Sequence, residues 1–420
     1  MRALLTRHWL KSAFTRGVLA IGGGTALAQL AAVLFSPVLT RLYSPEDMGM
    51  WGLFVSYVGF ASVIGSLRYE VAVVAARSEK DALELANGSL FLVVFTSFLG
   101  MLAFEVMRQR GFFGLDALPM AASFLVFFTL LFTGFGQVLR YLALRRENFS
   151  LVGRFTVLQG WVKVLLQLIL APLDTLGLLL GETFGRLAAL RSLWKSTPQI
   201  TVSLNLSTLL RFKAYPVFQL PSSLLNTLAL VAPVPVFIAL YGPAVGGALA
   251  LAQRVVGLPV GLIGNAVADV FYGRASSLVR SNPGQLVGFF VGVFLRLLTI
   301  GVPLGVGMWI LAPRVVPWLF GPEWALAGSM MGVMGPWMAA QLAVSPVSRL
   351  VFLSDHAWVK LVYDVFALLI TLSPVWLGRK GGPEESLLQV SLGMTGLYVF
   401  YFLILLKLVY RLKTQKGGWV

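Results

Sequence analysis

The chain has 420 residues, of which 58% are hydrophobic and 12% are charged, and its mean hydropathy is +0.84. A soluble globular domain carries about 25% charged residues, so this composition excludes a soluble protein and predicts an all-α polytopic membrane protein. The formal net charge of +16 would suggest nucleic acid in a soluble protein. Here the positive charge lies mainly between apolar runs, so we expect no nucleic-acid partner.

The N-terminus has a basic segment followed by an apolar run at 17–39. A secretory signal has an apolar region of only about 7–15 residues, so we interpret the longer run as the first membrane span. The chain has no cysteine, and its two histidines, His8 and His356, lie outside the apolar runs. We therefore expect no disulfide, no metal site and no cofactor.

About twelve apolar runs follow one another, each long enough to cross the bilayer as a helix. Pro172-Leu173-Asp174-Thr175 must form a very tight turn between the fifth and the sixth. The predicted spans are 17–40, 51–76, 86–107, 117–139, 150–171, 175–193, 215–240, 244–272, 285–312, 325–353, 358–377 and 387–409.

The Lys and Arg residues predict the orientation of these spans. With a cytoplasmic N-terminus, most of the 33 Lys and Arg residues fall in inside segments, and Arg186, near the inside end of the sixth span, is counted with them. This bias follows the positive-inside rule and places both termini in the cytoplasm.

A short motif indicates an internal repeat. Leu42-Tyr43-Ser44-Pro45 with Gly49 recurs as Leu240-Tyr241-Gly242-Pro243 with Gly247, and Pro37 and Pro235 precede the two copies at the same offset. The repeat predicts two parallel six-helix bundles, residues 1–200 and 201–420, around a central cavity. Each copy predicts a tight outside corner between helices. The Gly22-Gly23-Gly24 run predicts close packing of the first span.

Ionisable residues near the membrane midplane are the first site candidates. Lys163, Arg254 and Arg296 each lie about 15–17 Å into a span, and Glu182 lies at a similar depth. Three cations against one carboxylate require a wet cavity or an arriving anion. A structural Lys163–Glu182 ion pair is an alternative that would remove one cation from the ligand site.

Polar stripes on two spans support a cavity, because a polar stripe on an apolar helix faces protein or water rather than lipid. Interhelical hydrogen bonding without transport is the alternative. The stripes are Gln159, Lys163 and Gln167 on the fifth span, and Arg254, Gly257, Gly261, Asn265 and Asp269 on the eighth.

Arg68 lies about 26 Å along the second span, where it either anchors the helix at the interface or binds substrate. Arg68 and Glu70 are two residues apart and so point to different faces of a helix, which predicts partners elsewhere for both. The candidates for binding a coupling Na⁺ or H⁺ are Asp269, Glu182, Asp364 and Glu70. A structural role at a helix end is the alternative for Asp269 and Asp364.

No enzyme site is expected. The predicted outside loops are short and contain no paired carboxylates, no phosphate-binding glycine loop and no nucleophile with a base.

The segment from Thr40 to Asp81 carries a family resemblance. The pattern P-x-x-T-R-L-Y-S-P-E-D-M-G, then S-L-R-Y-E-V-A-V-V at 66–74 and S-E-K-D-A at 78–82, resembles the polysaccharide-transporter (oligosaccharide flippase) family. This family lies within the multidrug/oligosaccharidyl-lipid/polysaccharide exporter superfamily. The corner Leu319-Phe320-Gly321-Pro322-Glu323-Trp324 is similar to an outside turn of the same family.

The resemblance implies a flippase of the bacterial inner membrane. Its substrate would be an oligosaccharide linked to undecaprenyl pyrophosphate, moved from the cytoplasmic to the periplasmic leaflet as two bundles rock with an ion gradient. Membrane lipid and other polysaccharide assembly proteins would be its partners. Arg68 lies on the S-L-R-Y-E motif, and Arg and Lys suit a pyrophosphate anion.

Three other functions remain open at this point. A multidrug antiporter of the same superfamily would export cations, which an excess of midplane cations disfavours. A membrane-embedded polysaccharide polymerase or glycosyltransferase would need a substantial outside loop. A lipid scaffold without transport would leave the polar stripes unexplained.

Overall fold

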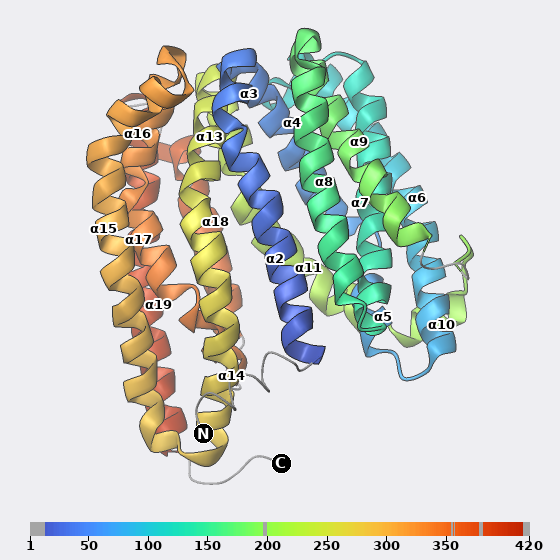
Figure 1. Ribbon diagram of the computed structural model, residues 1–420, viewed down its shortest axis with the longest axis vertical. Coiled ribbons are helices and arrows are strands. Elements are labelled where there is room, and N and C mark those ends of the chain that lie inside the picture. Colours follow the sequence, from blue (N-terminus) through green and yellow to red (C-terminus); the bar gives the residue numbers. More distant parts are fainter. Residues whose placement is uncertain (1–12, 196–199, 354–355, 357, 378–380, 415–420) are drawn as a thin grey trace. The chain divides into compact units, whose positions relative to one another are not determined.

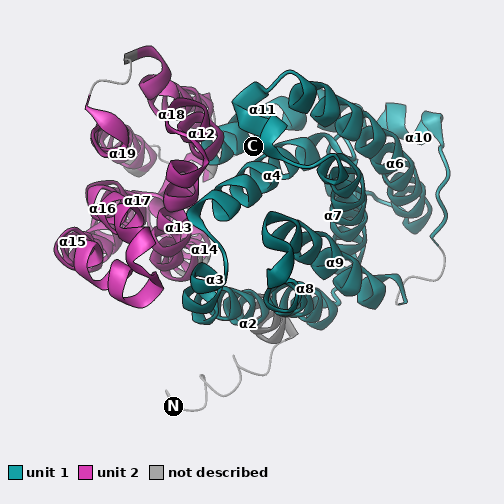
Figure 2. Cartoon of the chain, turned by 90° about the horizontal axis from the view of Figure 1, so that it is seen from above, with its two compact units in different colours: residues 1–231 teal, residues 232–420 magenta. Residues whose placement is uncertain are grey.

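The computed structural model describes residues 13–195, 200–353, 356, 358–377 and 381–414 (Figure 1). Helices are the regular elements of this part of the chain, and no strand occurs in it. By its internal contacts the chain separates into two compact units, Met1–Val231 (unit 1) and Ala232–Val420 (unit 2), which Figure 2 colours teal and magenta. The predicted bundles, residues 1–200 and 201–420, stay a prediction.

Unit 1 is built from long helices joined by short corners and turns. The structure also has a short helix, α10, between the sixth and the seventh predicted spans. The helices are α2 (Ala13–Leu34), α3 (Ser36–Leu42), α4 (Pro45–Ile64), α5 (Tyr69–Ala75), α6 (Glu79–Gln109), α7 (Ala121–Arg145), α8 (Phe149–Ile169), α9 (Asp174–Trp194), α10 (Leu206–Arg211) and α11 (Leu220–Val231).

Unit 2 has a core in which α15, α17, α18 and α19 contribute buried residues. The rings of Phe294 and Phe402 stack there with their centroids 3.9 Å apart. The helices of this unit are α12 (Pro233–Tyr241), α13 (Pro243–Pro259), α14 (Asn265–Ser281), α15 (Leu286–Phe320), α16 (Ala325–Val333), α17 (Gly335–Val344), α18 (Trp358–Leu377) and α19 (Gly382–Thr414).

The predicted fold class is confirmed. Nine helices in the described ranges are long and apolar enough to cross a membrane, and the pair Tyr215–Val231 and Pro233–Tyr241 can make a tenth. The other two predicted spans coincide with α9 and with the α16–α17 pair. These segments are helical but are not among the helices that are long and apolar enough to be counted as membrane spans. A helix therefore lies at every predicted span, and the chain is a multi-pass membrane protein.

Both copies of the repeated motif form the predicted corners. In the first, Ser44 accepts a hydrogen bond from the Asp47 backbone, Asp47 accepts one from the Ser44 backbone, and Pro45 begins α4. In the second, Gly242 has a φ of +93°, which few other residues adopt, and Pro243 begins α13. Local chemistry thus ends one helix and starts the next at the same place in each copy.

The first corner is tied to the interior of unit 1 through Tyr43. Its hydroxyl donates to the Gln167 carbonyl oxygen at 2.5 Å. Burial raises the pKa of Tyr43 to about 12, so the hydroxyl keeps its proton at neutral pH and can donate.

Close packing at the glycine run is confirmed at Gly24. A Cβ there would lie 2.7 Å from the Gly153 carbonyl oxygen, so α2 and α8 approach with their backbones nearly in contact. At Gly22 and Gly23 a Cβ would meet open space.

Several predicted spans differ from the observed helices, and three differences bear on the site or on the loops. The second span is broken after Ile64, because Leu67 and Arg68 adopt left-handed conformations with φ of +52° and +68°. The ninth continues through Pro313 and Pro317, where an outside loop was predicted, and ends at Phe320. The eighth contains a π-helical segment at Val260–Gly264, which changes the helical register within the predicted polar stripe.

Candidate functional site

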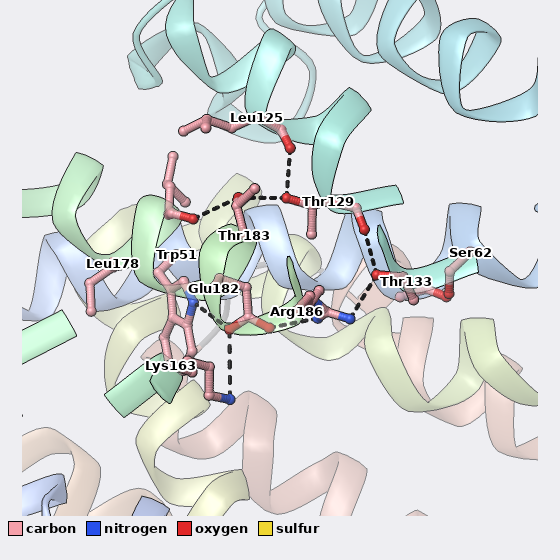
Figure 3. Close-up of polar contacts among 12 residues, drawn as sticks. Trp51, Ser62, Leu125, Thr129, Thr133, Lys163, Leu178, Glu182, Thr183 and Arg186 are labelled. Atoms are coloured by element: carbon pink, nitrogen blue, oxygen red, sulfur yellow. Dashed lines mark hydrogen bonds and ion pairs between the residues drawn. The ribbon is translucent and has the colours of Figure 1, made fainter. Parts of the chain in front are cut away.

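A buried carboxylate organises the interior of unit 1. Glu182 on α9 is 3% exposed, and one of its oxygens lies 2.6 Å from Arg186 Nη2. Its other oxygen lies 3.7 Å from Lys163 Nζ on α8 and accepts a hydrogen bond of 3.3 Å from Trp51 Nε1 on α4. Figure 3 shows the three side chains converging on Glu182. Two positive charges therefore share one negative charge, which leaves the group with a net positive charge.

Two glycines bring Lys163 to this carboxylate. A Cβ on Gly185 would lie 2.8 Å from Lys163 Cβ, and a Cβ on Gly181 would lie 2.5 Å from Gln167 Cγ. Gly181 and Gly185 are four residues apart on α9, and Lys163 and Gln167 are four residues apart on α8. Each helix therefore presents its two residues on one face. Glycine at these positions lets α8 and α9 approach closely enough for the ion pair to form.

Threonine hydroxyls on α7 and α9 extend the polar network. Arg186 Nη1 donates to Thr133 Oγ1 at 2.8 Å, and Thr133 in turn donates to the Thr129 carbonyl oxygen at 2.5 Å. The hydroxyls of Thr129 and Thr183 are 2.7 Å apart (Figure 3). These hydrogen bonds hold Arg186 between two helices and fix the position of its guanidinium.

A polar cavity of about 160 Å³ lies beside Arg186. It has room for several water molecules or a phosphate-sized group, since a water molecule takes about 30 Å³ in the liquid. Guanidinium groups can bind phosphate oxygens, and amides and hydroxyls can bind sugar hydroxyls, so this lining has groups suited to either ligand. The lining residues are Phe132, Thr133, Gly136, Gln137 and Arg140 of α7, Phe155 and Gln159 of α8, and Arg186 of α9.

The predicted residues of the fifth span have different surroundings. Lys163 contacts Glu182, as in the ion-pair alternative. Gln159 lines the polar cavity. Gln167 is 1% exposed and donates to the Leu178 carbonyl oxygen at 3.3 Å, so it links α8 to α9. Substrate binding by these three residues stays a prediction.

The expectation that Arg68 and Glu70 have separate partners is wrong in part. Arg68 Nη1 lies 3.3 Å from Glu70 Oε1, because the left-handed break before α5 removes the helical spacing on which that expectation depended. Arg68 also donates to Ser223 of α11, from Nε at 3.0 Å and from Nη2 at 2.6 Å. Glu70 is 2% exposed and accepts a hydrogen bond from Ser66 as well.

The predicted residues of unit 2 lie on four helices. Arg254 is half-buried on α13, and Arg296 is exposed on α15. Asp364 is buried on α18 and forms an ion pair with Lys360. Asn265 and Asp269 belong to α14, and their side chains lie outside the described part of the structure. The binding roles of all five remain predictions.

Four residues of the network and the cavity were not among the predicted site residues: Arg186, Arg140, Thr133 and Trp51. Arg186 was assigned to an inside segment, whereas α9 continues for about two turns beyond it. The spacing of Glu182 and Arg186, four residues apart, was the available signal for an ion pair on one helix face.

The fold and this site define a class of protein, a polytopic helical membrane protein with a polar cavity lined by two arginines. Over 94% of this chain and 87% of the other, the structure matches lipid II flippase MurJ in an inward closed conformation, with a TM-score of 0.71 and 15% identity. It matches an inward-facing multidrug resistance MATE family transporter of the MOP superfamily over 97% of this chain and 100% of that one, with a TM-score of 0.64 and 13% identity. At these identities the matches show a shared fold.

The family follows from the sequence. Residues 38–328 match the family model described as polysaccharide biosynthesis protein, and the chain belongs to that family. A relative, the succinoglycan biosynthesis transport protein ExoT of Rhizobium meliloti (strain 1021), is 23% identical over 313 residues, which are 71% of this chain and 60% of the relative. The chain thus spans about three fifths of the length of that relative. The predicted family resemblance is confirmed.

Proposed function

We propose that this protein is a flippase for an oligosaccharide linked to undecaprenyl pyrophosphate. It moves this substrate from the cytoplasmic to the periplasmic leaflet of the bacterial inner membrane by alternating access. Membership of the polysaccharide biosynthesis family, the similarity in sequence to a succinoglycan transport protein and the fold shared with a lipid II flippase support the proposal.

The excess of positive charge inside unit 1 carries the proposal. Lys163 and Arg186 share the carboxylate of Glu182, and Arg140, an exposed side chain near the end of α7, adds a cation at the cavity wall. Charge at bilayer depth is costly unless it serves a ligand or a partner. A pyrophosphate supplies the missing negative charge, and Arg can bind its oxygens bidentately.

The same residues suggest how an ion gradient drives transport. Glu182, Glu70 and Asp364 each contact a basic side chain. Protonation of Glu182 would release Lys163 and Arg186 to the substrate anion, and loss of that proton would favour the ion pairs again and release the anion.

The direct test deletes the gene and follows the lipid-linked oligosaccharide. We expect it to accumulate on the cytoplasmic side, where an enzyme added outside intact spheroplasts cannot reach it.

Replacement of Arg254 or Arg140 by Ala is expected to abolish flipping at a normal membrane level of protein. Arg314→Ala, an exposed side chain on α15, is the control with the same charge change. An unchanged lipid-linked pool in the deletion strain would refute the proposal.

Two competing functions predict different results. A multidrug antiporter would protect cells from organic cations, and this activity would survive loss of the cavity cations. A polymerase or glycosyltransferase would change glycan chain length while leaving the lipid-linked unit accessible outside.

A further inference from the structure

A second kind of cavity lies between α18 and α19 in unit 2, which pack against each other. Its volume is about 260 Å³, and it is apolar along most of its length and basic at one end. Val362 and Phe366 of α18 and Phe400 and Ile404 of α19 form apolar walls. The lining of this cavity differs in chemistry from that of the polar cavity of unit 1, and the cavity has no part in the proposed transport mechanism.

Basic side chains gather at one end of this cavity. Lys407 and Arg411 are four residues apart in the last turns of α19, so they lie on one helix face, and His356 lines the same cavity. Both α19 side chains are exposed. Guanidinium and ammonium groups bind phosphate oxygens, so this end suits an anionic headgroup.

The apolar end of the cavity is open to the surroundings. Phe366 is 52% exposed and Phe400 is 61% exposed, as expected for side chains that contact lipid. Seven residues of helix separate Phe400 from Lys407, which places the apolar wall about 10 Å from the cation. Trp358, which is 60% exposed at the start of α18, also lines the cavity and is a residue type enriched at membrane interfaces.

Unit 1 has the same arrangement at the end of α9. Arg191 and Lys195 are again four residues apart, next to Trp194, and they line an apolar groove of about 890 Å³ with Val162 and Leu166 of α8. By the predicted spans, α9 and α19 are the sixth and the twelfth, which are corresponding helices of the parallel repeat. A basic pair at the end of an apolar groove thus occurs twice, at the end predicted to be cytoplasmic.

We propose that the α18–α19 cavity binds an anionic phospholipid of the surrounding membrane. The phosphate lies between Lys407 and Arg411, and one acyl chain follows the wall formed by Val362, Phe366 and Phe400. Basic pockets between membrane helices bind anionic headgroups in this way, and each cation near the surface contributes about 1 kcal/mol. This site is separate from the proposed substrate site, so its occupancy does not depend on flipping.

The test counts phospholipids retained by the purified full-length protein in native mass spectrometry, with phosphatidylglycerol and phosphatidylethanolamine of identical acyl chains. We expect preferential retention of phosphatidylglycerol. The K407Q/R411Q double variant is expected to bind one phosphatidylglycerol about 30-fold more weakly. The R77Q/K80Q variant has the same charge change at exposed positions on the same predicted side and should match the wild type.

Val362→Trp is the second variant, because it fills the apolar wall while both cations remain. It should lose the same phosphatidylglycerol with an unchanged elution profile of the folded protein. Equal retention of phosphatidylethanolamine, or unchanged retention of phosphatidylglycerol in K407Q/R411Q, would overturn the proposal. Displacement of phosphatidylglycerol by undecaprenyl phosphate at equal concentration would assign the cavity to a polyprenyl lipid instead and would also overturn it.

Discussion

The interiors of the two units differ in chemistry. Unit 1 contains the ion network around Glu182 and a polar cavity with Arg140 and Arg186 on its walls. Unit 2 contains a cavity of about 730 Å³ between α15, the α16–α17 pair and α19, whose lining is apolar except for Thr395. The motif corners are retained in both units, whereas the interiors have diverged.

This difference shows how cations can be kept at membrane depth. In unit 1 the two cations that flank Glu182 are held by a carboxylate and by hydroxyls on neighbouring helices, so the desolvation cost is offset. The apolar cavity of unit 2 has no such partners in its described lining and would suit hydrocarbon. Three substitutions test this contrast, and a fourth tests the first corner.

The largest effect is expected from Glu182→Ala. Removal of the carboxylate leaves Lys163 and Arg186 without compensation in the interior, which should lower the free energy of unfolding by about 3 kcal/mol. Thermal unfolding of the purified protein in detergent, followed by tryptophan fluorescence, measures the change. Glu323→Ala removes an exposed carboxylate of unit 2 and should have almost no effect. Equal stability of the two variants would show that the network is unimportant to the fold.

A smaller effect is expected from Gly185→Ala. The new Cβ would lie 2.9 Å from the Lys163 Cα, so α8 and α9 must separate at a cost of about 2 kcal/mol. Gly257→Ala in unit 2 is the matched control, because its Cβ meets open space and should stabilise the helix by about 0.5 kcal/mol. In the same unfolding assay we expect the free energy of unfolding to fall in G185A and to rise in G257A. A stabilised G185A variant would contradict the close contact between α8 and α9.

The next comparison concerns transport. Gln159→Leu removes an amide from the polar cavity and should reduce flipping about tenfold, the effect of one lost hydrogen bond of about 1.4 kcal/mol. Thr395→Val changes the polar residue of the apolar cavity, whose hydroxyl already donates to the Ser391 carbonyl oxygen within its own helix at 2.7 Å. Its flipping rate should change less than twofold in reconstituted vesicles. Similar losses in both variants would remove the functional distinction between the cavities.

The smallest effect is expected at the first corner. Ser44→Ala removes the side chain that accepts from the Asp47 backbone, and loss of such a cap costs about 1 kcal/mol. Ser222→Ala, an exposed serine of α11, should leave the unfolding temperature within error. No change in S44A would mean that Pro45 alone begins the helix.

Local chemistry explains which parts of the fold were predictable. Long apolar runs must form helices in a membrane, and Pro with a neighbouring Gly or Ser gives the corners at Pro45 and Pro243. The break before α5 could not be predicted in this way, because Leu67 and Arg68 are residues that seldom adopt left-handed conformations. In this conformation Arg68 contacts Glu70 and Ser223, and the local sequence does not reveal these contacts.

By itself, the sequence determined the all-helical fold class, the positions of the spans, the two corners and the family, because each depends on composition or on contiguous residues. It also identified Lys163 and Glu182 as candidates for an ion pair. The tertiary structure decided that Arg186 shares this carboxylate and that Gln159, rather than Gln167, faces the polar cavity. Those assignments depend on how α7, α8 and α9 rotate and approach, which the glycines of α9 and the contacts between helices fix together.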